Sequence, residues 1–199
     1  AGDTVVLSGS GASVVTLGDG AGDTVEAAGK GADTLHLGAG AGDSVSLGAG
    51  RDIVFLGAGS GDVVAFASGI ANVSFAGPAA TADLSTVTTA SFATPTTASQ
   101  AQVLTNNLNV ITGFTAGDKI VLPAADAVVV GHNLAGSDGQ AVLASGTYDP
   151  LGGDFAYGAT GHDAMLTYDA GGGALVSVVL VGGAAEMAHA SVIGDVITF

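Results

Sequence analysis

The chain has 199 residues, of which 34 are Gly and none is Cys, and it carries 18 Asp and Glu against three Lys and Arg. The net charge of −15 repels nucleic-acid phosphates and anionic lipids, which are bound by clustered Lys and Arg, so nucleic acid is excluded as a partner. The absence of Cys excludes disulfides and thiolate metal sites. The longest apolar stretch, residues 174–185, is shorter than the roughly 18 residues of a membrane span, so no membrane insertion is expected.

Residues 1–77 consist of units about ten residues long. A typical unit alternates polar and apolar residues, as in Asp43-Ser44-Val45-Ser46-Leu47, and is followed by a Gly-rich turn. The alternation predicts a short β-strand, and the Gly-rich turn suits backbone with positive φ. Two strands and two turns make a coil of about twenty residues, and coils of this kind stack into a solenoid. We therefore expect an all-β protein with a parallel β-roll, or β-solenoid, of about ten-residue half-turns, followed by a β-rich C-terminal domain.

The alternation also predicts which side chains form the core. Side chains on a strand point to opposite faces in turn, so the first residue of a unit and the residues two and four positions later share one face. The first residue is usually Asp, but the other two residues of this face are apolar in nearly every unit, and the face is expected to point inward. The predicted core pairs are Val5/Leu7, Val15/Leu17, Val25/Ala27, Leu35/Leu37, Val45/Leu47, Val54/Leu56 and Val64/Phe66.

Stacking of the coils brings the acidic residues into two columns, because equivalent positions in adjacent coils lie about 4.8 Å apart. Two carboxylates at about 5 Å repel each other by roughly 3 kcal/mol at an effective dielectric near 20. Lys30 and Arg51 are the only basic residues in this block, so an external cation is expected between the carboxylates. The sequence predicts one column of Asp3, Asp23, Asp43 and Asp62, and another of Ser13, Asp33, Asp52 and Asn72.

Calcium is the cation that this pattern favours. It accepts six to eight oxygen ligands in flexible geometry, and Gly turns expose backbone carbonyls, whereas magnesium requires a strict octahedron and zinc prefers His or Cys. The predicted metal-site residues are Asp3, Asp23, Asp33, Asp43, Asp52, Asp62, Gly40, Gly50 and Gly59. The alternative hypothesis is that the carboxylates only cap turns by accepting bonds from backbone amides, and for Asp19 and Asp118 this alternative is at least as strong.

The segment Gly48-Ala49-Gly50-Arg51-Asp52-Ile53-Val54-Phe55 resembles the calcium-binding repeats of the RTX family, with Asp52 in the aspartate position and Val54 in the buried apolar position. Most other units differ from the family in having an extra residue and Ala in place of a second Gly. The resemblance implies a β-roll that folds when it meets external calcium.

The second half carries further resemblances. Residues 110–122 look like the strand–turn–strand segment that commonly follows RTX repeats, and residues 163–169 with 178–182 are similar to the last strands of proteins exported by type I secretion. The ending, residues 190–191 followed by 195–199, resembles an uncleaved C-terminal export signal. These resemblances imply an interaction with the type I secretion machinery and a location outside, or on the surface of, a Gram-negative bacterium.

The sequence thus predicts three segments. Residues 1–77 form the calcium-binding roll, and residues 78–102, which are rich in Ala, Thr and Ser without a sustained period, form an excursion or loop. Residues 103–199 contain several β-like runs separated by Gly-rich turns and form the C-terminal domain with the secretion signal.

No catalytic signature is present in the sequence. It lacks H-E-x-x-H and G-x-S-x-G motifs, and His162-Asp163, the only close His–acid pair, is interpreted as a turn before a strand. The Gly clusters lack the Lys-Ser/Thr of a phosphate-binding loop, and the Thr residues form no persistent ladder for ice binding. We therefore expect a non-enzyme: a secreted, calcium-dependent structural protein that assembles with itself into a surface layer, filament or extracellular matrix. The alternative is a C-terminal export and folding module of a larger type I-secreted exoenzyme or adhesin.

Overall fold

The computed structural model describes residues 2–67, 75–76, 103–104, 108–123, 127–130, 140–151, 154–157, 160–169 and 175–199. Within these ranges the protein consists of β-strands and one short 3₁₀ helix, η2 (Glu186–Ala188), which confirms the predicted all-β class. None of the described helical structure is long and apolar enough to cross a membrane. The excursion predicted at residues 78–102 lies outside the described residues.

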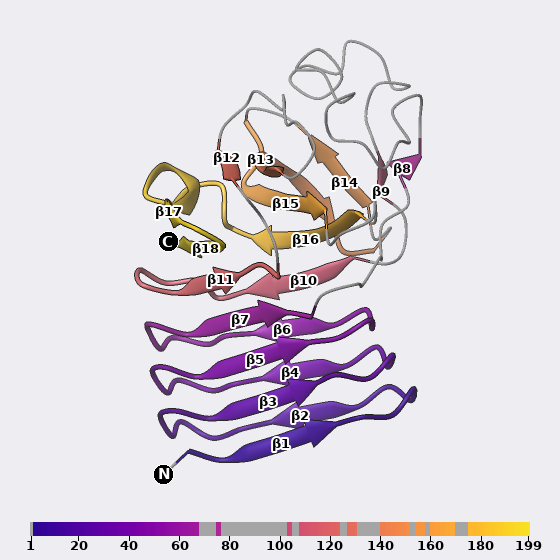
Figure 1. Ribbon diagram of the computed structural model, residues 1–199, viewed down its shortest axis with the longest axis vertical. Helices are drawn as coiled ribbons and strands as arrows, with labels where there is room; N and C mark the ends of the chain where they lie inside the picture. The colour runs from indigo at the N-terminus through magenta and orange to yellow at the C-terminus, as the bar shows by residue number, and fades with distance from the viewer. Residues whose placement is uncertain are drawn as a thin grey trace.

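The amino-terminal part is a stack of two-stranded coils (Figure 1). The odd-numbered strands pair in parallel in one sheet and the even-numbered strands pair in parallel in the other. The register advances by one coil at each step, so that Thr24 pairs with Ser44 and Thr34 with Ile53. The strands of the stack are β1 (Thr4–Leu7), β2 (Val14–Thr16), β3 (Thr24–Ala27), β4 (Thr34–His36), β5 (Ser44–Leu47), β6 (Ile53–Phe55) and β7 (Val63–Phe66).

The stack continues beyond β7 with strands that are distant in sequence. β10 (Asn109–Thr112) pairs in parallel with β6, and β11 (Lys119–Val121) pairs in parallel with β7. These two strands therefore form one more coil of the roll, although they lie within the segment predicted as the C-terminal domain, residues 103–199. The boundary predicted at residue 77 does not mark the end of the stack, because the repeat resumes after the intervening segment.

The rest of the C-terminal region extends both sheets from the last coil (Figure 1). On the even-numbered side, β16 (Leu175–Val181) pairs in parallel with β10, and β15 (Asp163–Asp169) follows antiparallel to β16. On the other side, β18 (Val196–Thr198) pairs antiparallel with β11, and β17 (Ser191–Ile193) ends that sheet. The remaining strands are β12 (Ala127–Val130), β13 (Gln140–Asp149) and β14 (Asp154–Tyr157), which extend the sheet of β15, and the separate pair of β8 (Phe75–Ala76) and β9 (Val103–Leu104).

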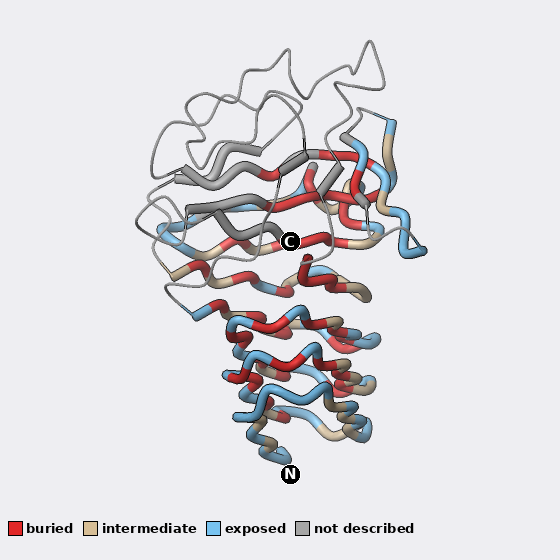
Figure 2. The backbone as a smooth tube through the Cα atoms, turned by 90° about the vertical axis from the view of Figure 1, so that its right-hand side faces the viewer, coloured by how far each residue is buried: buried red, intermediate tan, exposed pale blue. Residues whose placement is uncertain are grey.

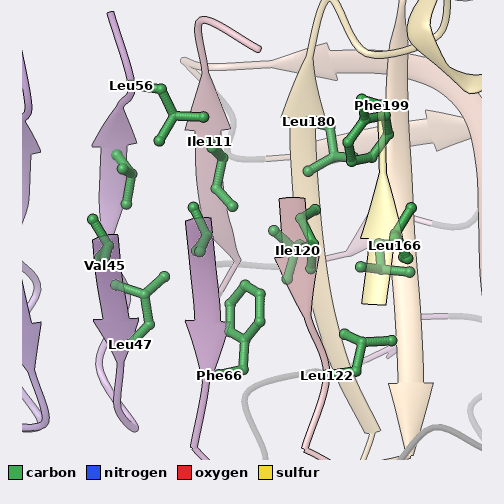
Figure 3. Packing of buried hydrophobic residues seen from close by; sticks show 14 of the residues in the cluster. Val45, Leu47, Leu56, Phe66, Ile111, Ile120, Leu122, Leu166, Leu180 and Phe199 are labelled. Carbon is green, nitrogen blue, oxygen red and sulfur yellow. The ribbon is translucent and has the colours of Figure 1, made fainter. Parts of the chain in front are cut away.

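One apolar core runs from the roll into the C-terminal region. Side chains from both parts, among them Leu47, Phe66, Leu180 and Phe199, belong to one buried cluster and point into the same interior (Figure 3). The predicted core pairs from Val25/Ala27 to Val64/Phe66 are buried. Burial decreases toward the N-terminus, where the inward residues of the first coil are only partly buried (Figure 2). The C-terminal strands therefore close one end of the core.

Candidate functional site

The turns of the roll form two edges. The first edge consists of turns 17–23, 37–43, 56–62 and 113–118, each of which leads into a strand of the odd-numbered sheet. The second edge consists of turns 8–13, 28–33 and 48–52, together with residues 108–109, and leads into the even-numbered sheet. The stacking places the residue that precedes each strand next to its equivalent in the adjacent coil.

A ladder of Asp residues runs along the first edge. The Oδ1 atom of each Asp accepts a hydrogen bond from the backbone N–H of the equivalent residue in the preceding coil. Because each side chain ties one coil to the previous one, the ladder fixes the register of the stack. The donor and acceptor pairs are Asp3 and Asp23 at 2.7 Å, and Asp23 and Asp43, Asp43 and Asp62, and Asp62 and Asp118, each at 2.9 Å.

The second edge carries the same arrangement with fewer carboxylates. The N–H of Ser13 donates to Asp33 at 2.8 Å, and the N–H of Asp33 donates to Asp52 at 3.0 Å. The last bond of this ladder joins the N–H of Asp52 to the Oδ1 of Asn109 at 2.9 Å. The turn-capping alternative places these bonds within one turn, whereas each of these Oδ1 atoms accepts from the backbone N–H of a neighbouring coil.

The other carboxylate oxygen has no such partner. The Oδ2 atoms of Asp23, Asp43, Asp52 and Asp62 are buried and accept no hydrogen bond from any described residue. These four residues are at most 1% exposed. An anionic oxygen that is withdrawn from water without a partner is costly, and a proton or a cation would relieve that cost. The buried donor set thus fits a hard cation, which binds carboxylate oxygens.

Burial also affects the protonation of the ladder. Withdrawal from water raises the pKa of Asp52 from 3.8 to about 6, an effect opposed by the bond from the Asp33 N–H and reinforced by the charge of Asp33. Burial raises the pKa of Asp62 as well, an effect opposed by the backbone N–H groups of Asp43 and Gly42 and reinforced by the charges of Asp118 and Asp43. Both shifts follow from the burial of the carboxylates away from water and from the like charges in adjacent coils.

The carboxylates alone do not surround an ion. Among the described residues there is no group of three or more His, Cys, Asp or Glu side chains that could hold a metal. A cation at an edge would therefore also need backbone oxygens.

The Gly residues of the turns pack coil against coil. A Cβ atom placed on Gly40 would lie 1.8 Å from the carbonyl oxygen of Gly20, and one on Gly59 would lie 1.6 Å from that of Gly40. Gly50 is equally close to the preceding coil, with its virtual Cβ 1.9 Å from the oxygen of Gly31. The three Gly residues predicted as metal ligands thus lie at close inter-coil contacts, where a side chain would collide with the neighbouring backbone. The carbonyl of Gly59 additionally accepts a hydrogen bond from the Thr115 hydroxyl at 2.5 Å.

The structure places all six predicted Asp residues in the two ladders and adds Asp118 and Asn109 to them. Asp118 is the next member of the first ladder and also caps its own turn, because its Oδ2 accepts the N–H of Thr115 at 2.7 Å. Asn109 stands beside Asp52, where the sequence predicts Asn72, and Asn72 lies outside the described residues. The signal for both additions is the similarity of residues 109–121 to a repeat unit, which is obscured by its distance from the other units.

The His162-Asp163 pair plays a structural part. Asp163 begins β15, and its carboxylate accepts hydrogen bonds from the backbone N–H groups of Tyr148 and Gly182, each at 2.8 Å. The carboxylate therefore ties β13 and the end of β16 to β15.

No known protein-family model matches the chain, and no curated protein shows significant similarity to it. The fold itself defines the class: a parallel β-solenoid whose coils are linked by buried Asp side chains at both edges.

Proposed function

We propose that the chain is a secreted structural protein of the RTX type, stabilised by calcium and exported by type I secretion to the surface of a Gram-negative bacterium, where it assembles with itself into a layer, filament or matrix. The observation that carries this proposal is the row of buried Oδ2 atoms on Asp23, Asp43 and Asp62, which have no partner among the described residues.

Calcium is the cation that best suits this row. Each Asp of the ladder, which we call a rung, offers a single free carboxylate oxygen. The remaining ligands must therefore be backbone carbonyls and water, which calcium accepts in flexible number and geometry. Bound ions would replace the repulsion between rungs with attraction, and binding would then contribute to folding. In this proposal Asp23, Asp43 and Asp62 hold the ions, and their Oδ1 atoms keep the coils in register.

The packing of the C-terminal residue supports export before folding. Phe199 is 6% exposed, and the ring centroids of Phe199 and Phe114 are 5.0 Å apart. The N–H of Phe199 donates to the carbonyl of Asp118, and its own carbonyl accepts from Gly117. A signal in this position is available to a secretion machinery only in the unfolded chain, and low calcium inside the cell would shift the folding equilibrium toward that state.

Two features support self-assembly. β17 forms the outer edge of the odd-numbered sheet, and its Ile193 is 81% exposed, so a strand of another copy can pair there. The net charge of −15 keeps copies apart until cations reduce their repulsion.

Folding in the presence of metal tests the calcium part of the proposal. We expect the calcium-free protein to melt at a much lower temperature and less cooperatively by circular dichroism than the calcium-loaded protein. An equal concentration of magnesium should have a much smaller effect. A metal-free protein with the same melting curve as the calcium-loaded protein would contradict the proposal.

Electron microscopy tests the assembly part. Purified protein is expected to form ordered sheets or filaments in calcium and to lose them in excess EGTA. A protein that folds in calcium but remains monomeric at every concentration would argue against a structural role and for the alternative of an export and folding module.

A further inference from the structure

We propose that the roll binds divalent cations along its first edge only, with one ion between the Asp23 and Asp43 rungs and one between the Asp43 and Asp62 rungs. This inference rests on the proposed function and makes it more specific, because it assigns the two edges of one solenoid different roles.

The two edges differ sharply in charge. The first-edge turns contain five carboxylates and no Lys or Arg, whereas the second-edge turns contain two carboxylates and two basic residues. With Asp3, which begins the ladder on the same edge, the formal charge is −6 on the first edge and zero on the second. The charged residues of the first edge are Asp3, Asp19, Asp23, Asp43, Asp62 and Asp118, and those of the second are Lys30, Asp33, Arg51 and Asp52.

The unpartnered oxygens follow the same division. On the first edge, three consecutive rungs have a buried Oδ2 atom without a hydrogen bond from the described residues. On the second edge only Asp52 does, and its neighbour Asn109 has a buried Nδ2 that likewise lacks a partner in the described part of the chain. An amide N–H group carries partial positive charge and repels a cation. Ser13 at the other end of that ladder contributes no charge at all.

The row of unpartnered Oδ2 atoms on the first edge ends at Asp118. Both oxygens of Asp118 are occupied, since its Oδ1 accepts the N–H of Asp62 and its Oδ2 accepts the N–H of Thr115. The Thr115 hydroxyl lies 3.3 Å from the same Oδ2 and donates to the Gly59 carbonyl. Thr115 thus satisfies the last rung with its own donors. The free oxygens between Asp23 and Asp62 remain as the place for ions.

Matched substitutions test the inference by isothermal titration with calcium chloride and by calcium-dependent melting. Asp43→Asn and Asp52→Asn each preserve an Oδ1 acceptor, as Asn109 does, and each removes one carboxylate from one edge. We expect Asp43→Asn to weaken calcium binding at least about tenfold and to reduce the calcium-induced rise in melting temperature. Asp52→Asn should leave both quantities close to those of the unaltered protein.

Equal losses in the two variants, or a larger loss in Asp52→Asn, would overturn the inference while leaving calcium binding itself intact. If the unaltered protein binds no calcium, the proposed function fails first, and the inference fails with it.

A measurement on the unaltered chain covers the case in which a variant does not fold. Mn²⁺ added in small amounts to the calcium-loaded protein broadens the NMR signals of nearby amides. We expect strong broadening at Gly42 and Gly61 on the first edge and little at Gly29 and Gly50 on the second. Comparable broadening at both edges would contradict the assignment.

Discussion

The backbone N–H of Asp52 donates to the side chain of Asn109 at 2.9 Å, the same distance that joins Asp23 to Asp43 through a carboxylate. A neutral amide oxygen therefore performs the inter-coil link as well as an anionic one. The link requires one oxygen and no charge, so the negative charge retained at the other rungs has no role in registering the coils. Its cost in the metal-free protein should be measurable.

Asp43→Asn and Asp43→Ala separate the two contributions of this residue in metal-free buffer. The Asn variant keeps an acceptor for the N–H of Asp23 and removes a buried charge, so its free energy of unfolding should equal or exceed that of the unaltered protein. The Ala variant leaves that N–H without its bond and should be less stable by about 1–3 kcal/mol. Urea denaturation compares them, and an Asn variant as unstable as the Ala variant would show that the charge itself stabilises the coil.

The raised pKa of Asp52 predicts an unusual pH dependence for the metal-free protein. Its pKa is 3.8 when exposed and about 6 in the fold, so the folded state holds a proton that the unfolded state releases. The stability from this proton is fully present below the unfolded pKa and is lost as the pH rises through about 6. The melting temperature should accordingly be higher near pH 5 than at pH 7.5.

Asp52→Asn provides the control for this effect, since it removes the titrating group. The pH dependence between 5 and 7.5 should be smaller in this variant. An unchanged profile would assign the dependence to other carboxylates.

Gly31→Ala and Gly11→Ala test the close packing of the turns with the same chemical change one coil apart. A Cβ on Gly31 would lie 2.3 Å from the carbonyl oxygen of Gly11, whereas a Cβ on Gly11 would have no atom within 4 Å. The first substitution forces backbone apart and should destabilise by about 1–3 kcal/mol or more. The second should change stability by less than about 0.5 kcal/mol. Thermal melts of the two variants should therefore differ, and similar values would contradict the contact.

Phe199→Ala tests whether the last residue belongs to the core. Phe199 is buried in the cluster that joins the roll to the C-terminal strands, so its truncation should cost about 3–5 kcal/mol. Ile193→Ala, on the exposed edge strand, should have little effect on the free energy of unfolding. Chemical denaturation of the two variants in calcium makes the comparison. A small effect at Phe199 would show that the C-terminus is detachable.

The regular part of this fold could be predicted from sequence because each rule acts over a few residues. Strict alternation places Val45 and Leu47 inward, and a constant step stacks Asp23 on Asp43. The continuation through β10 could not be predicted in this way, because no local rule relates Asn109 to Asp52 across 57 positions. The unequal roles of Oδ1 and Oδ2 also escape sequence reasoning, since they depend on how a neighbouring backbone N–H approaches each side chain.

The interruption of the stack between β7 and β10 has a consequence for how such a solenoid tolerates added chain. The bonds that span it, from Asp52 to Asn109 and from Asp62 to Asp118, are as short as those between coils joined directly. The hydrogen-bond distance between adjacent coils is thus the same whether a short turn or a long segment connects them. Because the entropy of loop closure rises by only about 0.6 kcal/mol when a loop doubles in length, a foreign domain grafted into this connection should leave the stacked coils undisturbed.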